Sequence, residues 1–211
     1  MPLFARMIGT TAEIEDLFNA GWREVFSRGG GIGGLGLDSL EAATPGEAGA
    51  DPCKRQPLPV LDHLQAALDA AKKYELAGLA RLLDAAQPNV VWSRNEGYVN
   101  QGLHADFLDG YAYAALSTPA GPIRRTKPLA GFILLAPGIF YPPHHHAPRE
   151  IYLPMTPASW QLDKGDWFDV APGQVILHDS WQVHATRTLD EPFLAFVAWL
   201  DEADRNSIKW A

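Results

Sequence analysis

The sequence has few of the features that mark secreted, membrane-spanning or nucleic-acid-binding proteins. Its only cysteine is Cys53, so no intramolecular disulfide can form, and the interior of a cell is compatible. No apolar run approaches the ~20 residues that a membrane-spanning helix needs. The net charge is −8 and the basic residues form no cluster, which disfavours nucleic acid as a partner. The first residues lack the apolar segment and cleavage site of a signal peptide, so we expect a cytoplasmic protein.

The composition is that of a well-buried globule. With 211 residues, 47% of them hydrophobic, and seven tryptophans, the chain can bury a sizeable core. We expect an N-terminal helical region over residues 1–88 and a β-barrel domain over residues 89–211. The helical region contains a Gly-rich stretch at residues 29–58, which is predicted to be a linker or a lid.

Apolar residues recur at helical spacing in three stretches of the N-terminal region. Residues 10–28 are predicted to form an amphipathic helix, and Thr10-x-x-Glu13 is a capping-box pattern at its start. Leucine stripes predict two more helices, Pro59–Tyr74 and Glu75–Gln87. All three are expected to pack against the barrel, with a dimer contact as the alternative for the first.

From Asn89 onwards, short apolar segments separated by turn signals replace the helical spacing. Many short strands of this kind indicate an antiparallel sandwich or barrel, whose mouth would hold a metal ion and a small ligand. The predicted strands are Val90–Trp92, Tyr111–Leu116, Gly131–Leu135, Glu150–Leu153, Trp160–Leu162, Asp166–Val170, Val175–His178, His184–Thr188 and Phe193–Leu200.

The candidate metal ligands lie in and just after a run of three histidines, His144 to His146. In an extended chain, residues i and i+2 face the same side, so His144 and His146 point together while His145 points away. Glu150 and Tyr152 share a face of the next segment for the same reason. Two imidazoles, a carboxylate and a phenol are typical direct ligands of a divalent transition metal.

Two later histidines compete to complete this ligand set. His178 lies at a predicted strand end or turn, whereas His184 opens a strand that pairs naturally within the barrel, so His184 is favoured. His104 has no partner at metal spacing and is predicted to be structural. No cysteine takes part, and the imidazole and carboxylate ligands tolerate Fe, Mn, Ni, Co or Zn.

The motif has a family resemblance. Residues 138–150 read G-x5-H-x-H-x3-E, which resembles the first cupin motif, although Pro157 stands where that motif closes with glycine. Residues 165–173 resemble the first half of the second cupin motif, G-x5-P-x-G. Ala171 replaces its proline, and Ile176 stands where its histidine belongs. The resemblance implies a cupin fold, which is a double-stranded β-helix (jelly-roll) barrel.

Within the cupins, the stretch from Tyr141 to Trp199 is similar to the dimethylsulfoniopropionate (DMSP) lyases. The similarity rests on Glu150-x-Tyr152 and on the longer gap to His184. It implies one divalent metal ion, with Fe, Zn, Mn and Ni as candidates. The ligand set that it implies is His144, His146, Glu150, Tyr152 and His184.

The resemblance also implies a reaction, the β-elimination of DMSP to dimethyl sulfide and acrylate. The metal would bind the substrate carboxylate, and a tyrosinate, Tyr152 or Tyr141, would remove the α-proton. The small zwitterionic substrate is expected to contact Tyr141, His144 and Trp199. Aromatic ring faces attract its positively charged sulfonium group.

Other functions fit the same motif. An iron dioxygenase or a sugar isomerase would use the same metal ligands, and a non-catalytic cupin would only bind a small ligand or store a metal. A homodimer is left open, although no apolar stripe singles out an interface.

Overall fold

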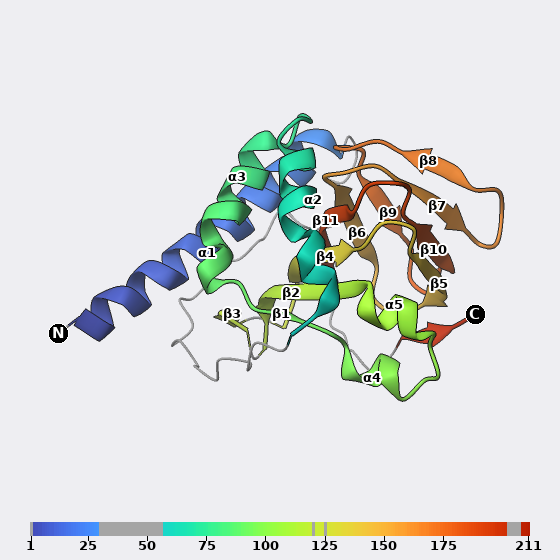
Figure 1. The fold of residues 1–211 in the computed structure, drawn as a ribbon, viewed down its shortest axis with the longest axis horizontal. Coiled ribbons are helices and arrows are strands. Elements are labelled where there is room, and N and C mark those ends of the chain that lie inside the picture. The colour runs from blue at the N-terminus through green and yellow to red at the C-terminus, as the bar shows by residue number, and fades with distance from the viewer. Residues whose placement is uncertain (1, 30–56, 120, 125, 202–207) are drawn as a thin grey trace.

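The computed structural model describes residues 2–29, 57–119, 121–124, 126–201 and 208–211. The Gly-rich stretch at residues 29–58 lies almost wholly outside these ranges, so its prediction as a linker or lid is not tested. Helices α1, α2 and α3 lie together on one side of two stacked β-sheets (Figure 1). No helix among the described residues is both long and apolar enough to cross a bilayer.

The predicted helices are present, with different ends. Helix α1 runs from Pro2 to Arg28, so Thr10 lies inside it and the predicted cap at Thr10 is wrong. The second predicted helix begins with a 3-10 segment, Pro59–His63 (η3), and continues as α2, Leu64–Ala71. The third is α3, Ala77–Ala86, followed by the 3-10 segment η4, Gln87–Asn89.

Two short helices before the barrel were not predicted. They are α4, Glu96–Val99, and α5, Ala105–Asp109. His104 caps α5, because its Nδ1 accepts the backbone N–H of Asp106 at 3.3 Å. This exposed histidine is therefore structural, as predicted.

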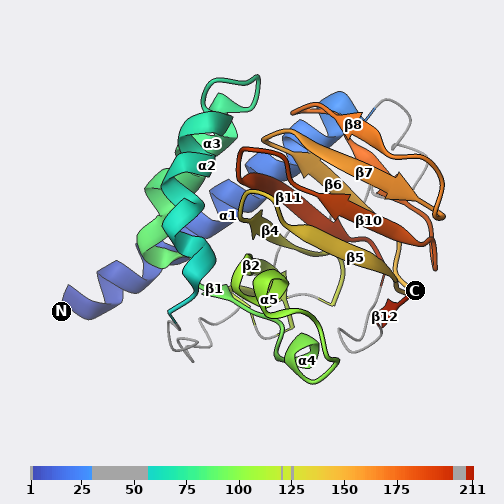
Figure 2. The same cartoon turned by 45° about the vertical axis from the view of Figure 1, so that its right-hand side comes forward.

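The strands form one seven-stranded and one five-stranded sheet, and the sheets lie one over the other (Figure 2). The order is β1-β2-β4-β11-β6-β9 in the first, with β3 on β2, and β12-β5-β10-β7-β8 in the second. All pairings are antiparallel except β2 with β3. The strands are β1 Trp92–Ser93, β2 Tyr111–Thr118, β3 Ile123–Arg124, β4 Leu129–Leu135, β5 Phe140–His145, β6 Glu150–Pro154, β7 Ala158–Leu162, β8 Phe168–Val170, β9 Ile176–His178, β10 His184–Arg187, β11 Phe193–Trp199 and β12 Lys209–Trp210.

This arrangement confirms the predicted barrel preceded by helices. Each predicted strand is present within a few residues, β5 lies in the stretch that was predicted to be extended, and β3 and β12 were not predicted.

The seven-stranded sheet is buried on both faces. Along β6, Ile151 and Leu153 face the helices and join their apolar core, whereas Tyr152 faces the space between the sheets. Strand β11 alternates in the same way, with Phe196 against the helices and Val197 on the inner face. Because the helices share a core with the sheet, they support its outer face and leave the inner face for the site. The division of the chain at residues 88 and 89 stays a prediction.

Candidate metal centre

A cavity of about 290 Å³ opens on the inner face of the seven-stranded sheet. Its wall combines aromatic rings, aliphatic side chains and a polar end made of two histidines and a glutamate. Residues of β2, β4, β5, β6 and β11 and of the segment before α4 contribute. The lining residues are Ser93, Arg94, Asn95, Tyr98, Tyr111, Tyr113, Leu129, Ile133, Tyr141, His144, His146, Glu150, Tyr152, Val197, Ala198, Trp199 and Ile208.

Strand register brings the polar residues together. Glu150 on β6 stands directly between Trp199 on β11 and His178 on β9. In the other sheet, His184 at the start of β10 is opposite His144 on β5. His146 follows the end of β5 and completes the group, while His145 turns away and packs against Trp181.

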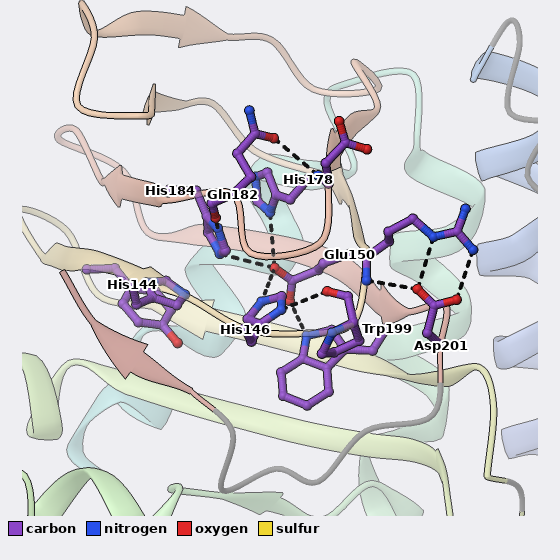
Figure 3. A network of polar contacts seen from close by, with 12 residues as sticks. His144, His146, Glu150, His178, Gln182, His184, Trp199 and Asp201 are labelled. Atoms are coloured by element: carbon purple, nitrogen blue, oxygen red, sulfur yellow. Dashed lines mark hydrogen bonds and ion pairs between the residues drawn. The ribbon is translucent and has the colours of Figure 1, made fainter.

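Glu150 is the hub of this group (Figure 3). Its Oε1 accepts the indole N–H of Trp199 at 2.8 Å. Its Oε2 lies 3.1 Å from His178 Nδ1, 3.2 Å from His146 Nε2 and 3.3 Å from His184 Nε2. The carboxylate is almost fully buried, with 4% of the residue exposed. A buried carboxylate with this many nitrogen neighbours is held in one orientation.

Three of the histidines present a lone pair to the centre. The Nδ1 atoms of His144, His146 and His184 lie 2.8, 2.8 and 2.9 Å from backbone carbonyl oxygens. Since a carbonyl oxygen only accepts, each Nδ1 carries a proton, and Nε2 of the neutral ring is left with its lone pair. Although it is buried, His184 Nε2 has no hydrogen-bond partner among the described residues.

This arrangement fits a bound cation. The lone pairs of His146 and His184 both face Glu150 Oε2, and they repel it unless a proton or a metal ion lies between them. Burial raises the pKa of Glu150. When a proton lies between His146 and Glu150, the resulting positive charge on His146 and the histidine hydrogen bonds hold the pKa of Glu150 well below its usual range. The donor atoms of His144, His146 and His184 lie within 4.8 Å of one another, as do those of Glu150, His178 and His184. This buried cluster is a candidate metal site.

The structure brings both competing histidines to Glu150. His178 differs from the other three, because its Nε2 accepts the indole N–H of Trp160 at 2.9 Å while its Nδ1 faces Glu150. Burial and the nearby His184 lower the pKa of His178 to about 4, so its ring is neutral at pH 7. Trp160 was expected only as part of the barrel, and its link to His178 was missed.

Both candidate tyrosines lie in the cavity wall. Tyr141 stacks on His144 with ring centroids 4.3 Å apart, and its hydroxyl is 2.7 Å from that of Tyr98. Tyr152 packs against both Trp160 and His178, with ring centroids 4.9 and 5.5 Å away. Burial raises the pKa of Tyr141 and of Tyr152 well above the ordinary value of 10.0. Either phenol therefore needs a nearby positive charge before it ionises at neutral pH.

Sequence reasoning missed three further tyrosines of the wall. Tyr98, Tyr111 and Tyr113 join the two candidates, so five of the six tyrosines line one cavity. The i, i+2 spacing of Tyr111 and Tyr113 on a predicted strand was a usable signal for a shared face. Tyr98 gave no such signal, because it reaches the cavity from a short helix.

Comparison with known proteins identifies DMSP lyases as relatives. The sequence profile of the DMSP lyase family matches residues 39–195. DMSP lyase DddQ of Ruegeria pomeroyi is 34% identical over 103 residues, which is 48% of this chain and 51% of DddQ. A provisionally named DMSP lyase, DddL of Cereibacter sphaeroides, is 30% identical over 148 residues, 70% of this chain and 61% of DddL. The matched stretches thus span between half and two thirds of these relatives' length.

Solved structures show the same fold over nearly the whole chain. A structure from a study titled for the DMSP lyases RdDddP and RnDddQII superposes with a TM-score of 0.74 at 25% identity, covering 96% of this chain and 99% of that one. The structure of DddQ from Ruegeria pomeroyi gives a TM-score of 0.75 at 24% identity, covering 95% and 96%. The cupin-type barrel with its N-terminal helices is therefore confirmed as the fold.

Proposed function

The chain belongs to the dimethylsulfoniopropionate lyase family, and from that premise we propose that it cleaves DMSP to dimethyl sulfide and acrylate by β-elimination. One observation carries the proposal. Three imidazole lone pairs and one buried carboxylate converge at the polar end of a cavity whose walls are aromatic. A zwitterion with a carboxylate at one end and a sulfonium at the other matches that division of the cavity.

The size and the aromatic wall of the cavity suit a small ligand with a positively charged end. The cavity volume of about 290 Å³ lies just below the ~300–1,000 Å³ of usual small-molecule sites, so the cavity suits a small ligand. Aromatic faces attract a sulfonium through their quadrupoles, and Tyr141 and Trp199 are the substrate contacts that we propose first. The Trp199 ring is fixed by its hydrogen bond to Glu150, so this wall is preorganised. His144, stacked on Tyr141, completes the proposed substrate contacts.

The proposed ligands of one divalent ion are His144, His146, Glu150 and His184, with Tyr152 as a further ligand. When bound, an ion such as Fe, Zn, Mn or Ni would polarise the substrate carboxylate and lower the pKa of a neighbouring phenol. The histidines keep their rings aimed by donating Nδ1–H to backbone carbonyls. The imidazole and carboxylate donor set admits several metals, so the ion is assigned by experiment.

A tyrosine is the proposed general base. The phenolate oxygen of Tyr152 or Tyr141 accepts the α-proton of the substrate. The electron pair of that C–H bond forms the Cα–Cβ double bond, and the β-carbon–sulfur bond breaks with its pair going to sulfur. Tyr98 lies 2.7 Å from the Tyr141 hydroxyl and can donate a hydrogen bond to its phenolate. Tyr152 shares the cavity face of β6 with Glu150.

Headspace gas chromatography for dimethyl sulfide tests the reaction. Protein stripped of metal by a chelator is mixed with DMSP, and Fe, Zn, Mn or Ni is added back. We expect dimethyl sulfide only with metal and at an unchanged rate without oxygen. Folded, metal-loaded protein that releases none would overturn the proposal, and oxygen uptake would then test for a dioxygenase.

The two tyrosines are separated by Tyr152→Phe and Tyr141→Phe, each of which removes one hydroxyl. Loss of the base costs ~10²–10⁴-fold in rate, so one variant should fall by that factor. Tyr74→Phe is the matched control, because Tyr74 is the one tyrosine outside the cavity lining. Full activity in both cavity variants would sink the tyrosinate mechanism.

We also keep as predictions that the protein works in the cytoplasm without nucleic-acid or membrane partners, and we leave open whether it forms a homodimer. Light scattering on the purified protein measures the oligomeric state directly. A mass of 23.1 kDa, that of one chain, would exclude the homodimer.

A further inference from the structure

Three buried side chains form a hydrogen-bonded chain that ends at Glu150. Trp160 on β7 donates its indole N–H to His178 Nε2 at 2.9 Å, and His178 Nδ1 lies 3.1 Å from Glu150 Oε2. Trp160 and His178 are each 0% exposed, and Glu150 is 4% exposed. Because Trp160 belongs to the five-stranded sheet and the other two to the seven-stranded sheet, the chain ties the two sheets together.

The direction of these hydrogen bonds is determined by the indole. An indole N–H only donates, so His178 Nε2 must accept and carries no proton. The single proton of the neutral ring therefore sits on Nδ1 and is donated to Glu150 Oε2. His144, His146 and His184 turn a lone pair towards the centre, whereas His178 turns an N–H towards it.

From this geometry we propose that His178 is a positioning residue, locked in one tautomer by Trp160, which orients the Glu150 carboxylate and does not bind the metal. Trp199 donates to Oε1 and His178 donates to Oε2, so each carboxylate oxygen has one donor that fixes the carboxylate plane. The inference rests on the proposed metal centre, and it assigns the contested ligand position to His184.

Two substitutions of His178 separate orientation from ligation. His178→Asn keeps an N–H at the Nδ1 position, while His178→Leu keeps an apolar volume and has no donor. Dissociation constants for Zn²⁺ are measured by chelator competition, with His184→Asn as the ligand control. We expect His178→Leu to weaken binding by ~10–100-fold, as the loss of a side chain that orients a metal ligand does. His178→Asn should stay within a few-fold of wild type.

The visible spectrum of the Co²⁺-loaded protein reports the ligand set itself. His178→Asn should keep the wild-type absorption bands, because no ligand has changed, whereas His184→Asn should alter them. If His178→Asn loses as much Zn²⁺ affinity as His184→Asn and changes the Co²⁺ spectrum in the same way, His178 is a ligand and the proposal is wrong.

Ring-nitrogen NMR at pH 7 reports the tautomer of His178, and its main measurement uses the unsubstituted protein. The Nδ1–H tautomer of His178 is expected both without metal and with Zn²⁺, and Trp160→Phe should admit the Nε2–H tautomer. An Nε2–H tautomer of His178 in the metal-free wild type would refute the claim that Trp160 determines the tautomer. A wild type that binds no metal would overturn the proposed function instead, while the tautomer still tests the role of His178.

Discussion

The two faces of strand β6 differ in the chemistry of the side chains that they bury. On the helix side, the apolar side chains of Ile151 and Leu153 are fully buried in an apolar core. On the cavity side, Glu150 and Tyr152 are almost as deeply buried but have histidine, indole and phenol neighbours. Burying a carboxylate costs free energy that burying a leucine does not, unless hydrogen bonds or a cation compensate it. The helix side therefore supplies stability, and the cavity side uses part of that stability to hold reactive groups.

The largest effect is expected on the cavity side. Glu150→Gln removes the charge that faces three histidine nitrogens, so metal affinity should fall by more than the ~100-fold of an outer-shell change. Dimethyl sulfide release should fall with it. Chelator competition and headspace gas chromatography measure both. Ile151→Val, on the other face of the same strand, is the control. Unchanged metal binding in Glu150→Gln would refute the role of Glu150.

The helix side should show the opposite pattern. Leu153→Ala removes fully buried apolar volume, and such truncations cost ~2–5 kcal/mol of unfolding free energy. The protein that stays folded should bind metal as the wild type does. Urea unfolding followed by circular dichroism gives the stability. If Leu153→Ala weakens metal binding as much as Glu150→Gln, the two faces do not act independently.

Metal removal links the two faces. A ligand that binds only the folded state stabilises it by ~2.7 kcal/mol at a free concentration of 100 times its dissociation constant. A chelator should therefore lower the melting temperature of the wild type and of Leu153→Ala by similar amounts. It should leave Glu150→Gln nearly unchanged. An equal response of all three variants would show that the ion binds elsewhere.

The smallest effect on stability is expected beside the site, at the ion pair of Arg149 and Asp201. Arg149 Nε donates to Asp201 Oδ2 at 3.0 Å, and Arg149 Nη2 donates to Asp201 Oδ1 at 2.9 Å. Hydrogen bonds from Arg149 lower the pKa of Asp201 below its ordinary value of 3.8. A carboxyl whose pKa is lower when folded stabilises the protein above the unfolded pKa, and this contribution disappears as the pH falls through the folded pKa.

Asp201→Asn should accordingly cost up to ~1 kcal/mol at neutral pH, because the pair is partly exposed. The difference from wild type should shrink as the pH falls below about 4. Urea unfolding at both pH values measures it, and a difference that grows in acid would contradict the assignment.

Local sequence pattern predicted the parts of the site that lie within a few residues of one another. The two-residue period placed His144 with His146 and Glu150 with Tyr152, and the structure puts all four in the cavity wall. The same reasoning failed at Thr10, because a capping motif is a weak preference that a continuing helix overrides. The order of strands and helices followed from periodicity, since each element buries one face or both.

By itself the sequence determined which residue types the site has, which of them share a face, and the family to which those motifs belong. Only the tertiary structure decided that His178 and His184 both reach Glu150, that Trp160 sets the tautomer of His178, and that Tyr98 enters the cavity. These partners are 18 to 43 residues apart along the chain. Their meeting depends on the register between distant strands and on the contact between two sheets, which no local period encodes, because register is determined by long-range pairing and by the packing of both faces at once.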